Sequence, residues 1–288
     1  MRIAASLAGI ERQRGSKVLV LAASNLEIEL LPALHDLLRG AGRSARLDVL
    51  LYCRGGSVAA ARRIALLLNE ATDHLSVVVP HHCESAGTIL ALAAREILAG
   101  PVAIFSPVDP ALHGSGRDED QPAAIAAQDL RLFAEMGKDW FGLTEAEAGE
   151  KALALLCQTI FPATLTSFYR ATREVEAICR ELLALRPGGA GEDSAAIVRS
   201  LLFGHHSHDF PLARDDLRAI GLPVRADPAV EELAWQVAGE LRAGVGGAAR
   251  ETEDDDWVDA LLATPRALVR RRRRPGVLAA AWEPDEPR

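Results

Sequence analysis

Short apolar segments alternate with helical patterns through the N-terminal part of the chain. Residues 17–23, 47–52 and 75–80 are rich in Leu, Val and Ala, which is typical of strands buried on both faces of a parallel sheet. Apolar residues recur at helical spacing over residues 26–38 and 57–71. This alternation predicts strand, helix, strand crossovers and therefore an α/β fold.

The rest of the chain is predicted to be mainly helical. After a helix over 89–95, short strands at 96–98 and 102–105 complete the first part. Further apolar stripes predict helices over 125–133, 146–157, 162–185, 194–203, 212–220 and 230–241. Residues 243–256 combine glycines with acidic residues, a composition typical of disorder. A short helix is predicted over 260–269.

The pattern divides the chain into three parts. Residues 1–121 are expected to form the α/β core, and residues 122–242 a helical extension that completes the domain. Residues 243–288 form an acidic and then arginine-rich tail that is expected to be disordered. The helix over 162–185 is long enough to project from the core and pack on a second subunit, so we expect a homo-oligomer.

Charge argues against a nucleic-acid partner. The chain has 288 residues and a formal net charge of −8, whereas phosphate binding needs a positive surface. The run from Arg270 to Arg274 is the exception, but it is local and lacks interleaved aromatic residues. The acidic run from Glu253 to Asp256 can neutralise it within the chain or across an oligomer.

Cysteines and apolar runs indicate the compartment. Cys53, Cys83, Cys157 and Cys179 show neither metal-ligand spacing nor a compact disulfide framework, so buried free thiols are expected. No apolar run approaches the roughly 20 residues needed to span a bilayer, and residues 3–10 are too short for a signal-peptide core. We therefore expect a cytoplasmic protein that uses no metal or other cofactor.

Two predicted neighbouring strands end in residues that could carry chemistry. Gly55 and Gly56 permit close backbone approaches, so their N–H groups can be directed at one point. Ser85 precedes Ala86 at a predicted helix start, where amide donors favour an anion. A hydroxyl beside such donors is the minimum for attack on a carbonyl with stabilisation of the oxyanion. The structural alternative is an N-cap serine and a tight glycine turn.

Several motifs occur in order along the chain. They are Glu11-Arg-Gln-Arg-Gly-Ser-Lys-Val, Arg54-Gly-Gly-Ser-Val, Val79-Pro-His-His-Cys-Glu-Ser-Ala-Gly-Thr, Gly100-Pro, Ser106-Pro-Val-Asp-Pro and Ser207-His-Asp-Phe-Pro-Leu. Together they resemble the serine dehydrogenase proteinase (SDH) family of Clp-fold serine peptidases, which is related to signal peptide peptidase A and to crotonases. The resemblance implies a Clp/crotonase-like spiral of strand and helix units. It also implies Ser85 as the nucleophile and the Gly55–Gly56 turn as an oxyanion element.

The chain departs from the family's pattern at two sites. Cys53-Arg54 stand where members often have Thr-Pro, and Glu84 stands where they often have Met. Loss of the proline loosens the turn. A carboxylate beside the nucleophile could oppose an oxyanion if it pointed inward.

The sequence leaves the general base open. The position where Clp proteases carry a histidine corresponds to Val108, and His113 falls in a predicted loop. Relatives of the signal peptide peptidase type use a lysine, which needs a pKa lowered by burial. Lys138 and Lys151 are the lysines of the helical part and could fold back over the site.

His208 is the other candidate for the base. The segment Ser207-His208-Asp209 matches a Thr-His-Asp pattern of the family, so His208 is either a site residue or a structural histidine. Asp109 lies in a turn that prolines fix, and it is a supporting candidate.

Three functions are compatible with these residues. A serine peptidase that acts on a peptide or protein substrate is the leading hypothesis. The second is a catalytically weak Clp-fold scaffold that binds peptides or partner proteins, and the third is a crotonase-like acyl-thioester enzyme.

Overall fold

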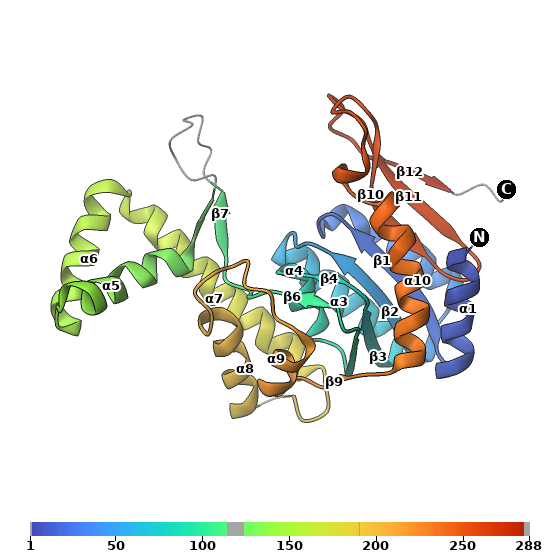
Figure 1. Ribbon diagram of the computed structural model, residues 1–288, viewed down its shortest axis with the longest axis horizontal. Coiled ribbons are helices and arrows are strands. Elements are labelled where there is room, and N and C mark those ends of the chain that lie inside the picture. The colour runs from blue at the N-terminus through green and yellow to red at the C-terminus, as the bar shows by residue number, and fades with distance from the viewer. Residues whose placement is uncertain (1, 114–123, 190, 285–288) are drawn as a thin grey trace.

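A parallel sheet forms the centre of the molecule. The structure is a computed structural model that describes residues 2–113, 124–189 and 191–284 (Figure 1). Its parallel strands lie in the order β1 (Lys17–Ala23), β2 (Ser44–Cys53), β3 (Thr72–Val79), β5 (Glu96–Ala99) and β9 (Val224–Arg225). The predicted strands and the α/β fold class are confirmed.

Helices cover both faces of this sheet. The 3-10 helix η1 (Ile28–Leu30), α2 (Leu31–Ala41) and α3 (Val58–Glu70) pack on one face, whereas α1 (Arg2–Arg14) and α10 (Pro228–Gly244) pack on the other. Neighbouring residues of β2 alternate between the two cores, because Leu51 faces the first and Leu50 the second. Burial on both faces explains why the second half of β2, from Val49 to Cys53, is a continuous apolar run.

The C-terminal segment extends the sheet. β10 (Trp257–Ala263) pairs antiparallel with β1, and β11 (Leu268–Arg273) and β12 (Ala281–Pro284) follow beside it. Within the described residues 243–284, the structure therefore differs from the disorder predicted over 243–288 and from the helix predicted over 260–269. The arginine run can lie in a strand because acidic side chains from other elements neutralise it.

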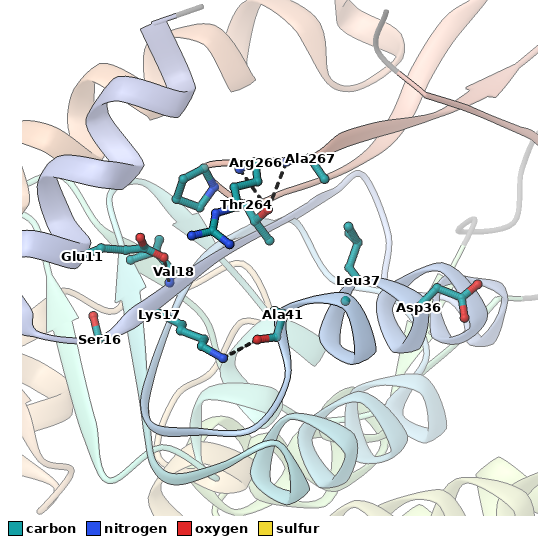
Figure 2. Close-up of a pocket in the computed structure, with 12 residues that line it drawn as sticks. Glu11, Ser16, Lys17, Val18, Asp36, Leu37, Ala41, Thr264, Arg266 and Ala267 are labelled. Carbon is teal, nitrogen blue, oxygen red and sulfur yellow. Dashed lines mark hydrogen bonds between the residues drawn. The ribbon is translucent and has the colours of Figure 1, made fainter. Parts of the chain in front are cut away.

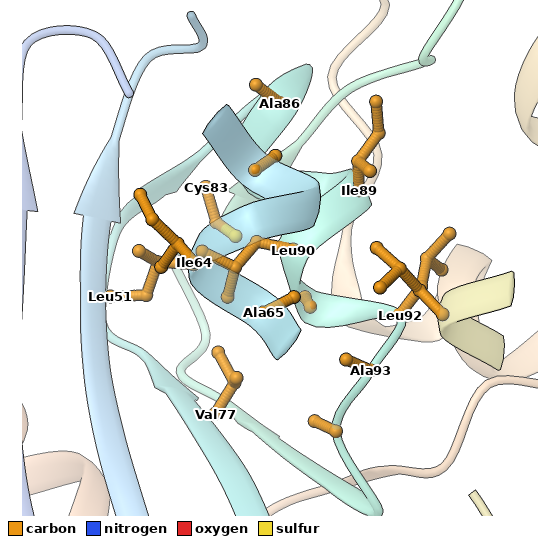
Figure 3. Close-up of a cluster of buried hydrophobic side chains, with 14 of the residues drawn as sticks. Leu51, Ile64, Ala65, Val77, Cys83, Ala86, Ile89, Leu90, Leu92 and Ala93 are labelled. Atoms are coloured by element: carbon orange, nitrogen blue, oxygen red, sulfur yellow. The ribbon is translucent and has the colours of Figure 1, made fainter. Parts of the chain in front are cut away.

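A second small layer lies beside the end of β2. β4 (His82–Cys83) and β6 (Ile104–Phe105) pair there, and α4 (Ala86–Ala91) follows β4. Every residue of α4 is buried, and α3 packs against it (Figure 3). A Cβ at Gly87 would lie 2.5 Å from the sulfur of Cys53, so glycine lets α4 approach the end of β2 closely.

Helices make up most of the second part of the chain. They are α5 (Ala127–Phe141), α6 (Glu145–Thr159), α7 (Pro162–Ala184), α8 (Glu192–Phe203) and α9 (Arg214–Ala219), preceded by the hairpin of β7 (Ala111–His113) and β8 (Ala124–Ala126). Figure 1 shows α5 and α6 extending away from the sheet. Among the described residues, no single helix is both long and apolar enough to cross a membrane, whereas α6 and α7 together meet those criteria across a bend of 117°.

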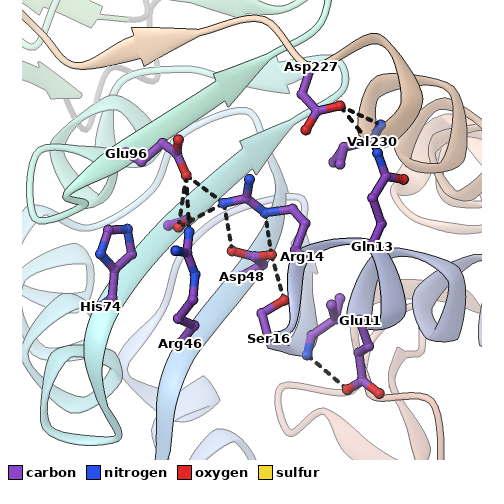
Figure 4. Close-up of polar contacts among 12 residues, drawn as sticks. Glu11, Gln13, Arg14, Ser16, Arg46, Asp48, His74, Glu96, Asp227 and Val230 are labelled. Carbon is purple, nitrogen blue, oxygen red and sulfur yellow. Dashed lines mark hydrogen bonds and ion pairs between the residues drawn. The ribbon is translucent and has the colours of Figure 1, made fainter.

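A buried polar cluster ties α1 to the sheet (Figure 4). The Arg14 guanidinium lies 2.7 Å from a carboxylate oxygen of Asp48 and 2.5 Å from one of Glu96. The hydroxyl of Ser16 donates to Asp48 at 2.7 Å, and Glu11 accepts the backbone N–H of Val18 at 3.0 Å. The N-terminal motif of the sequence therefore has a structural role, since its side chains connect α1, β1 and β2.

Candidate active site

The glycine turn after β2 is held by Leu26. The backbone N–H of Leu26 donates to the carbonyl of Gly55 at 2.8 Å, and the Leu26 carbonyl accepts from Ser57 at 2.8 Å. Gly55 and Gly56 have φ angles of 140° and 126°, a region that side chains disfavour. A Cβ at Gly56 would lie 2.3 Å from the nitrogen of Leu26. Glycine is therefore required at position 56 by both conformation and space.

Ser85 lies directly against this turn. A Cβ at Gly55 would be 3.4 Å from the Cβ and 3.9 Å from the Oγ of Ser85. The two junctions named from the sequence, about thirty residues apart, thus meet in space, as expected of adjacent strand ends in an α/β sheet. Ser85 is half-buried, and Ala86 behind it is fully buried.

The backbone of Ser85 is strained. Its φ of 49° is the only positive value among the described non-glycine residues, and its ψ is −110°. Such a conformation costs on the order of 1–3 kcal/mol and persists where the surroundings impose it. The side chain of Ser85 forms no N-cap hydrogen bond. The structural interpretation of Ser85 as a simple helix cap therefore fails, because capping requires that bond.

Ser106 and Thr88 impose the conformation of Ser85. The Ser106 hydroxyl accepts the backbone N–H of Ser85 at 2.8 Å, and the Ser106 N–H lies 3.3 Å from the hydroxyl of Thr88. The Thr88 hydroxyl donates in turn to the carbonyl of Cys83 at 2.9 Å. In the sequence, Ser106 stands out only as part of the Ser106-Pro-Val-Asp-Pro motif. Its pairing with Ser85 depends on the contact between β4 and β6, which no local pattern encodes.

His208 forms a hydrogen-bonded pair with the buried carboxylate of Asp109. The Nδ1 of His208 lies 2.9 Å from Oδ1 of Asp109, and the Asp109 side chain is only 4% exposed. The hydrogen bond to Asp109 raises the pKa of His208 above 6.5, against the lowering effect of burial. The other carboxylate oxygen of Asp109 is buried and has no partner among the described residues.

A backbone bridge brings this pair together. Phe105 and Leu212 exchange two hydrogen bonds, of 2.9 and 2.8 Å. Asp109 lies four residues after Phe105 and His208 four residues before Leu212, so the two segments meet again at these side chains. One short segment, residues 105–109, therefore contacts Ser85 through Ser106 and His208 through Asp109.

Lys138 and Lys151 occupy exposed positions in the extending helices. The Nζ of Lys138 lies 3.9 Å from Glu145, and its side chain is 37% exposed. Lys151 is exposed on α6. Both helices extend away from α4 (Figure 1), and neither lysine is buried.

Glu84 is directed to a histidine. Its carboxylate contacts Nδ1 of His82, whose Nε2 lies 3.3 Å from the guanidinium of Arg54. The two departures from the family's pattern, at 54 and 84, are thus joined through His82. His82 and Tyr52 are in ring contact, with centroids 5.7 Å apart.

His81, which precedes His82, lies among cationic and aromatic side chains. His81 contacts Trp235 of α10 at a centroid distance of 6.2 Å, and Arg242 lies 4.4 Å over the Trp235 ring. Burial lowers the pKa of His81 to about 4, and neighbouring cations, Arg242 and Arg54 among them, act in the same direction. His81 is therefore neutral at physiological pH.

Three of the four cysteines are buried thiols, as the sequence predicted. Burial raises the pKa of Cys53 and of Cys179 to about 12, and that of Cys83 well above its ordinary value. The Gly55 backbone N–H donates toward the Cys53 sulfur, which opposes this rise. Cys157 is exposed on α6, so the prediction of a buried thiol is wrong there. Helix α6 extends from the body of the protein, and this placement is a tertiary property.

A cavity of about 360 Å³ lies elsewhere, between α2 and the turn from β10 to β11 (Figure 2). Lys17, Asp36 and Arg266 contribute to its lining, but no residue of the Ser85 site does. The Lys17 ammonium donates to the carbonyls of Ala41 and Gly42 at the end of α2. In the described parts of the chain, no three His, Cys, Asp or Glu side chains are arranged to hold a metal ion.

Part of the chain matches a known protein family. Residues 5–125 match the family of ClpP-like SDH-type serine proteinases. The matched segment includes β1 to β6, the glycine turn, Ser85 and Asp109. The resemblance inferred from the sequence motifs is thereby confirmed, and with it the ClpP-like character of the α/β core.

Two proteins of Methanocaldococcus jannaschii are relatives over longer segments. MJ1495 is 27% identical over 231 residues, which is 76% of this chain and 70% of that protein. MJ0137 is 27% identical over 187 residues, which is 65% of this chain and 56% of that protein. Both are described as uncharacterized.

The solved structures that this chain is similar to have low sequence identity and TM-scores below 0.5. A ClpP1 mutant from Listeria monocytogenes is 15% identical, with a TM-score of 0.40, and the match covers 77% of this chain and 99% of that one. A putative enoyl-CoA hydratase from Streptomyces coelicolor A3(2) is 15% identical, with a TM-score of 0.37, over 79% of this chain and 70% of that one.

Proposed function

We propose that the protein is a serine peptidase whose nucleophile is Ser85. The observation that carries this proposal is the strained backbone of Ser85, held against the glycine turn with its side chain free of any capping bond. A strained serine between a strand and a helix exposes its hydroxyl to a carbonyl, and such strain is characteristic of functional residues.

Gly56 and Ala86 are the best candidates for the oxyanion donors. In the parallel bridge with Leu26, it is Gly55 and Ser57 that bond to Leu26, so the N–H of Gly56 points to the opposite side. Among the described residues, neither the Gly56 nor the Ala86 N–H has an acceptor. Gly55 instead directs its N–H toward Cys53, so its role is to leave space beside Ser85.

His208 is a better candidate for the general base than Lys138 or Lys151. Its Nδ1 is bonded to Asp109, which leaves Nε2 to accept a proton, as in a Ser-His-Asp arrangement. The Ser85 oxygen attacks the substrate carbonyl while its proton passes to His208, and the protonated imidazole then donates that proton to the departing amine. Water then attacks the acyl-serine while His208 takes a proton from it. The protonated His208 returns that proton to the Ser85 oxygen as the acyl group leaves.

The proposed substrate is a peptide or protein, and the proposed assembly is a homo-oligomer in the cytoplasm. No step of this reaction needs a metal or a cofactor. No nucleic acid is part of the proposal, since Arg271, Arg272 and Arg273 are each engaged by acidic residues of the chain.

A fluorophosphonate probe tests the nucleophile. We expect one covalent adduct, located on Ser85 by mass spectrometry of the folded protein, and none on the Ser85→Ala variant. Peptide hydrolysis should disappear in the same variant. An intact Ser85→Ala protein that retains its partner proteins, with no adduct on the unsubstituted protein, would indicate the scaffold function instead.

Variants of the candidate bases separate histidine from lysine. His208→Gln should reduce the rate of labelling by about 10²-fold or more, the usual contribution of a general base. His206→Gln, on the same loop and exposed, is the matched control and should leave the rate unchanged. If Lys138→Met or Lys151→Met caused the loss and His208→Gln did not, a lysine base would be supported.

A further inference from the structure

The arginines of β11 bind the segment that holds the glycine turn. Arg271 is 2% exposed, and its guanidinium binds Asp259 through two hydrogen bonds of 2.8 Å. Its Nη2 also lies 2.9 Å from the carboxylate of Glu27. Arg273, on the same face of β11, lies 2.6 Å from Asp259 and 2.7 Å from Glu27. Two guanidinium groups thus share two carboxylates, and the group is electrically balanced.

Both ends of the segment from Ser24 to Glu27 are fixed by these C-terminal strands. At one end, the backbone N–H of Ser24 donates to the carbonyl of Asp259 at 2.8 Å. At the other end, Glu27 is bound by Arg271 and Arg273. The pairing register of β10 and β11 shifts at residue 259, and this irregularity places Asp259 between the two sets of contacts.

Leu26, between these two anchored ends, is in contact with the glycine turn on its other side. It bonds to the backbone of Gly55 and Ser57, and its own nitrogen lies 2.3 Å from where a Cβ of Gly56 would be. Leu26 is fully buried, so it has little freedom to move independently of its neighbours. A shift of Glu27 would therefore be passed through one peptide unit to the turn beside Ser85.

We propose that Arg271 and Arg273 are positioning residues for the oxyanion turn, acting through Glu27 and Leu26 on Gly56. This inference rests on the proposed function, since it assigns a task to residues remote from the nucleophile. It gives the arginine run a function within the chain. An oxyanion donor must be held within a few tenths of an ångström to act, so fixing the turn from its outer side has a direct effect on rate.

Glu27→Gln tests the proposal with little change of shape, and Glu283→Gln is its matched control. Glu283 pairs with Arg272 of the same strand at 3.1 Å and is 42% exposed, against 34% for Glu27. Glu27→Gln removes a carboxylate that Arg271 and Arg273 share, and Glu283→Gln removes the carboxylate that binds Arg272. Only Glu27 adjoins Leu26. We expect Glu27→Gln to slow phosphonate labelling of Ser85 by about tenfold, a fraction of the loss of a whole oxyanion donor. Glu283→Gln should stay within about twofold of the unsubstituted protein.

Two further measurements separate positioning from general stability. Peptide hydrolysis should lose kcat with KM unchanged, because an oxyanion contact is made only in the transition state. Hydrogen exchange over residues 53–60 should become faster in Glu27→Gln, and not in Glu283→Gln, since the Ser57 N–H bonds to Leu26. Arg273→Lys keeps a cation beside Glu27 and should retain most of the rate, whereas Arg273→Gln should behave as Glu27→Gln does.

The outcomes distinguish this inference from the proposed function. If the unsubstituted protein is not labelled, the peptidase proposal fails, and the inference, which depends on it, is overturned as well. If the unsubstituted protein is labelled but Glu27→Gln reacts at an unchanged rate, the inference alone is overturned. Equal losses in Glu27→Gln and Glu283→Gln would also overturn it, because the effect would then be a general weakening of the C-terminal strands.

Discussion

The Ser106 hydroxyl accepts the backbone N–H of Ser85 at 2.8 Å, across 21 positions of the chain. This bond occupies the serine's own N–H, so an oxyanion needs donors from its neighbours. It also fixes Ser85 to the segment that ends in Asp109, the partner of His208. The candidate nucleophile and the candidate base are therefore positioned by the same short stretch of chain.

Replacing Ser85 with glycine should stabilise the fold while removing activity. Glycine adopts a φ of 49° without strain, which stabilises the folded state. Glycine also increases the conformational entropy of the unfolded chain, and this offsets only part of the stabilisation. We expect the free energy of unfolding to rise by about 1 kcal/mol, measured by chemical denaturation. Ser85→Ala keeps the strain and should change it by less than about 0.5 kcal/mol. Equal free energies of unfolding for Ser85→Gly and Ser85→Ala would contradict the presence of backbone strain at residue 85.

The two glycines of the turn should respond differently to alanine. At Gly56 the new Cβ would overlap the backbone of Leu26 at 2.3 Å, so Gly56→Ala should lose about 3 kcal/mol or fail to fold. At Gly55 the nearest atom is the Ser85 Cβ at 3.4 Å, so Gly55→Ala should fold, be destabilised by its φ, and react more slowly with the phosphonate. Thermal denaturation beside labelling measures both effects. Full activity in Gly56→Ala would show that the turn is not needed.

Activity should depend on the protonation of His208. The pKa of His208 is raised above 6.5 by its hydrogen bond to Asp109, and only the neutral imidazole can accept a proton. The logarithm of kcat/KM should therefore rise with pH through a midpoint above 6.5 and then level off. Asp109→Asn should lower kcat by orders of magnitude, because the imidazole loses the partner that orients it. A profile that is flat between pH values of about 5 and 8 would exclude this base.

The raised pKa of His208 also makes the stability of the fold depend on pH, and stability falls with rising pH whereas activity increases. A histidine whose folded-state pKa is raised prefers to be protonated in the native protein. Its stabilising contribution is complete below pH 6.5, the unfolded value, and is lost as the pH rises through the folded value. Denaturation curves of the parent and of His208→Gln should therefore converge toward alkaline pH, with His206→Gln as the control.

Thiol reactivity should follow burial. The raised pKa values of Cys53, Cys83 and Cys179 keep these groups protonated, and all three are buried. In the native protein a maleimide should modify Cys157 alone, and all four cysteines should react after denaturation. Intact-mass measurement gives the number of adducts. Rapid native modification of Cys83 would indicate that α4 opens, because the thiol lies beneath it.

The extending helices should carry contacts between subunits. Trp140 and Phe161 on α5 and at the start of α7 are 77% and 75% exposed in the isolated chain. Large apolar side chains so exposed are typical of protein interfaces. We expect light scattering to show a homo-oligomer that Trp140→Glu or Phe161→Glu dissociates. Leu278→Glu, at a residue 98% exposed near β12, should not affect the mass. A monomeric parent protein would contradict the proposal.

Much of the fold could be predicted because its core is locally encoded. The strand predicted over 17–23 coincides with β1, and the predicted helix over 57–71 differs from α3 by one residue at each end. Both elements pack against the core, so the spacing of their apolar residues must follow the geometry of a strand or of a helix. The same regularity predicts that Gly55 and Ser85 lie at the ends of neighbouring strands.

The sequence by itself predicted the candidate reactive residues and the approximate positions of β1, β2, β3 and β5, because backbone conformation and side-chain period are local properties. Only the tertiary structure decided that Arg271 lies in a strand, that Ser106 holds Ser85, and that His208 meets Asp109 from 99 positions away. A charge is stable in the interior only beside an opposite charge, and a hydroxyl only with a hydrogen-bond partner. That partner comes from a distant segment, and no local pattern specifies which one.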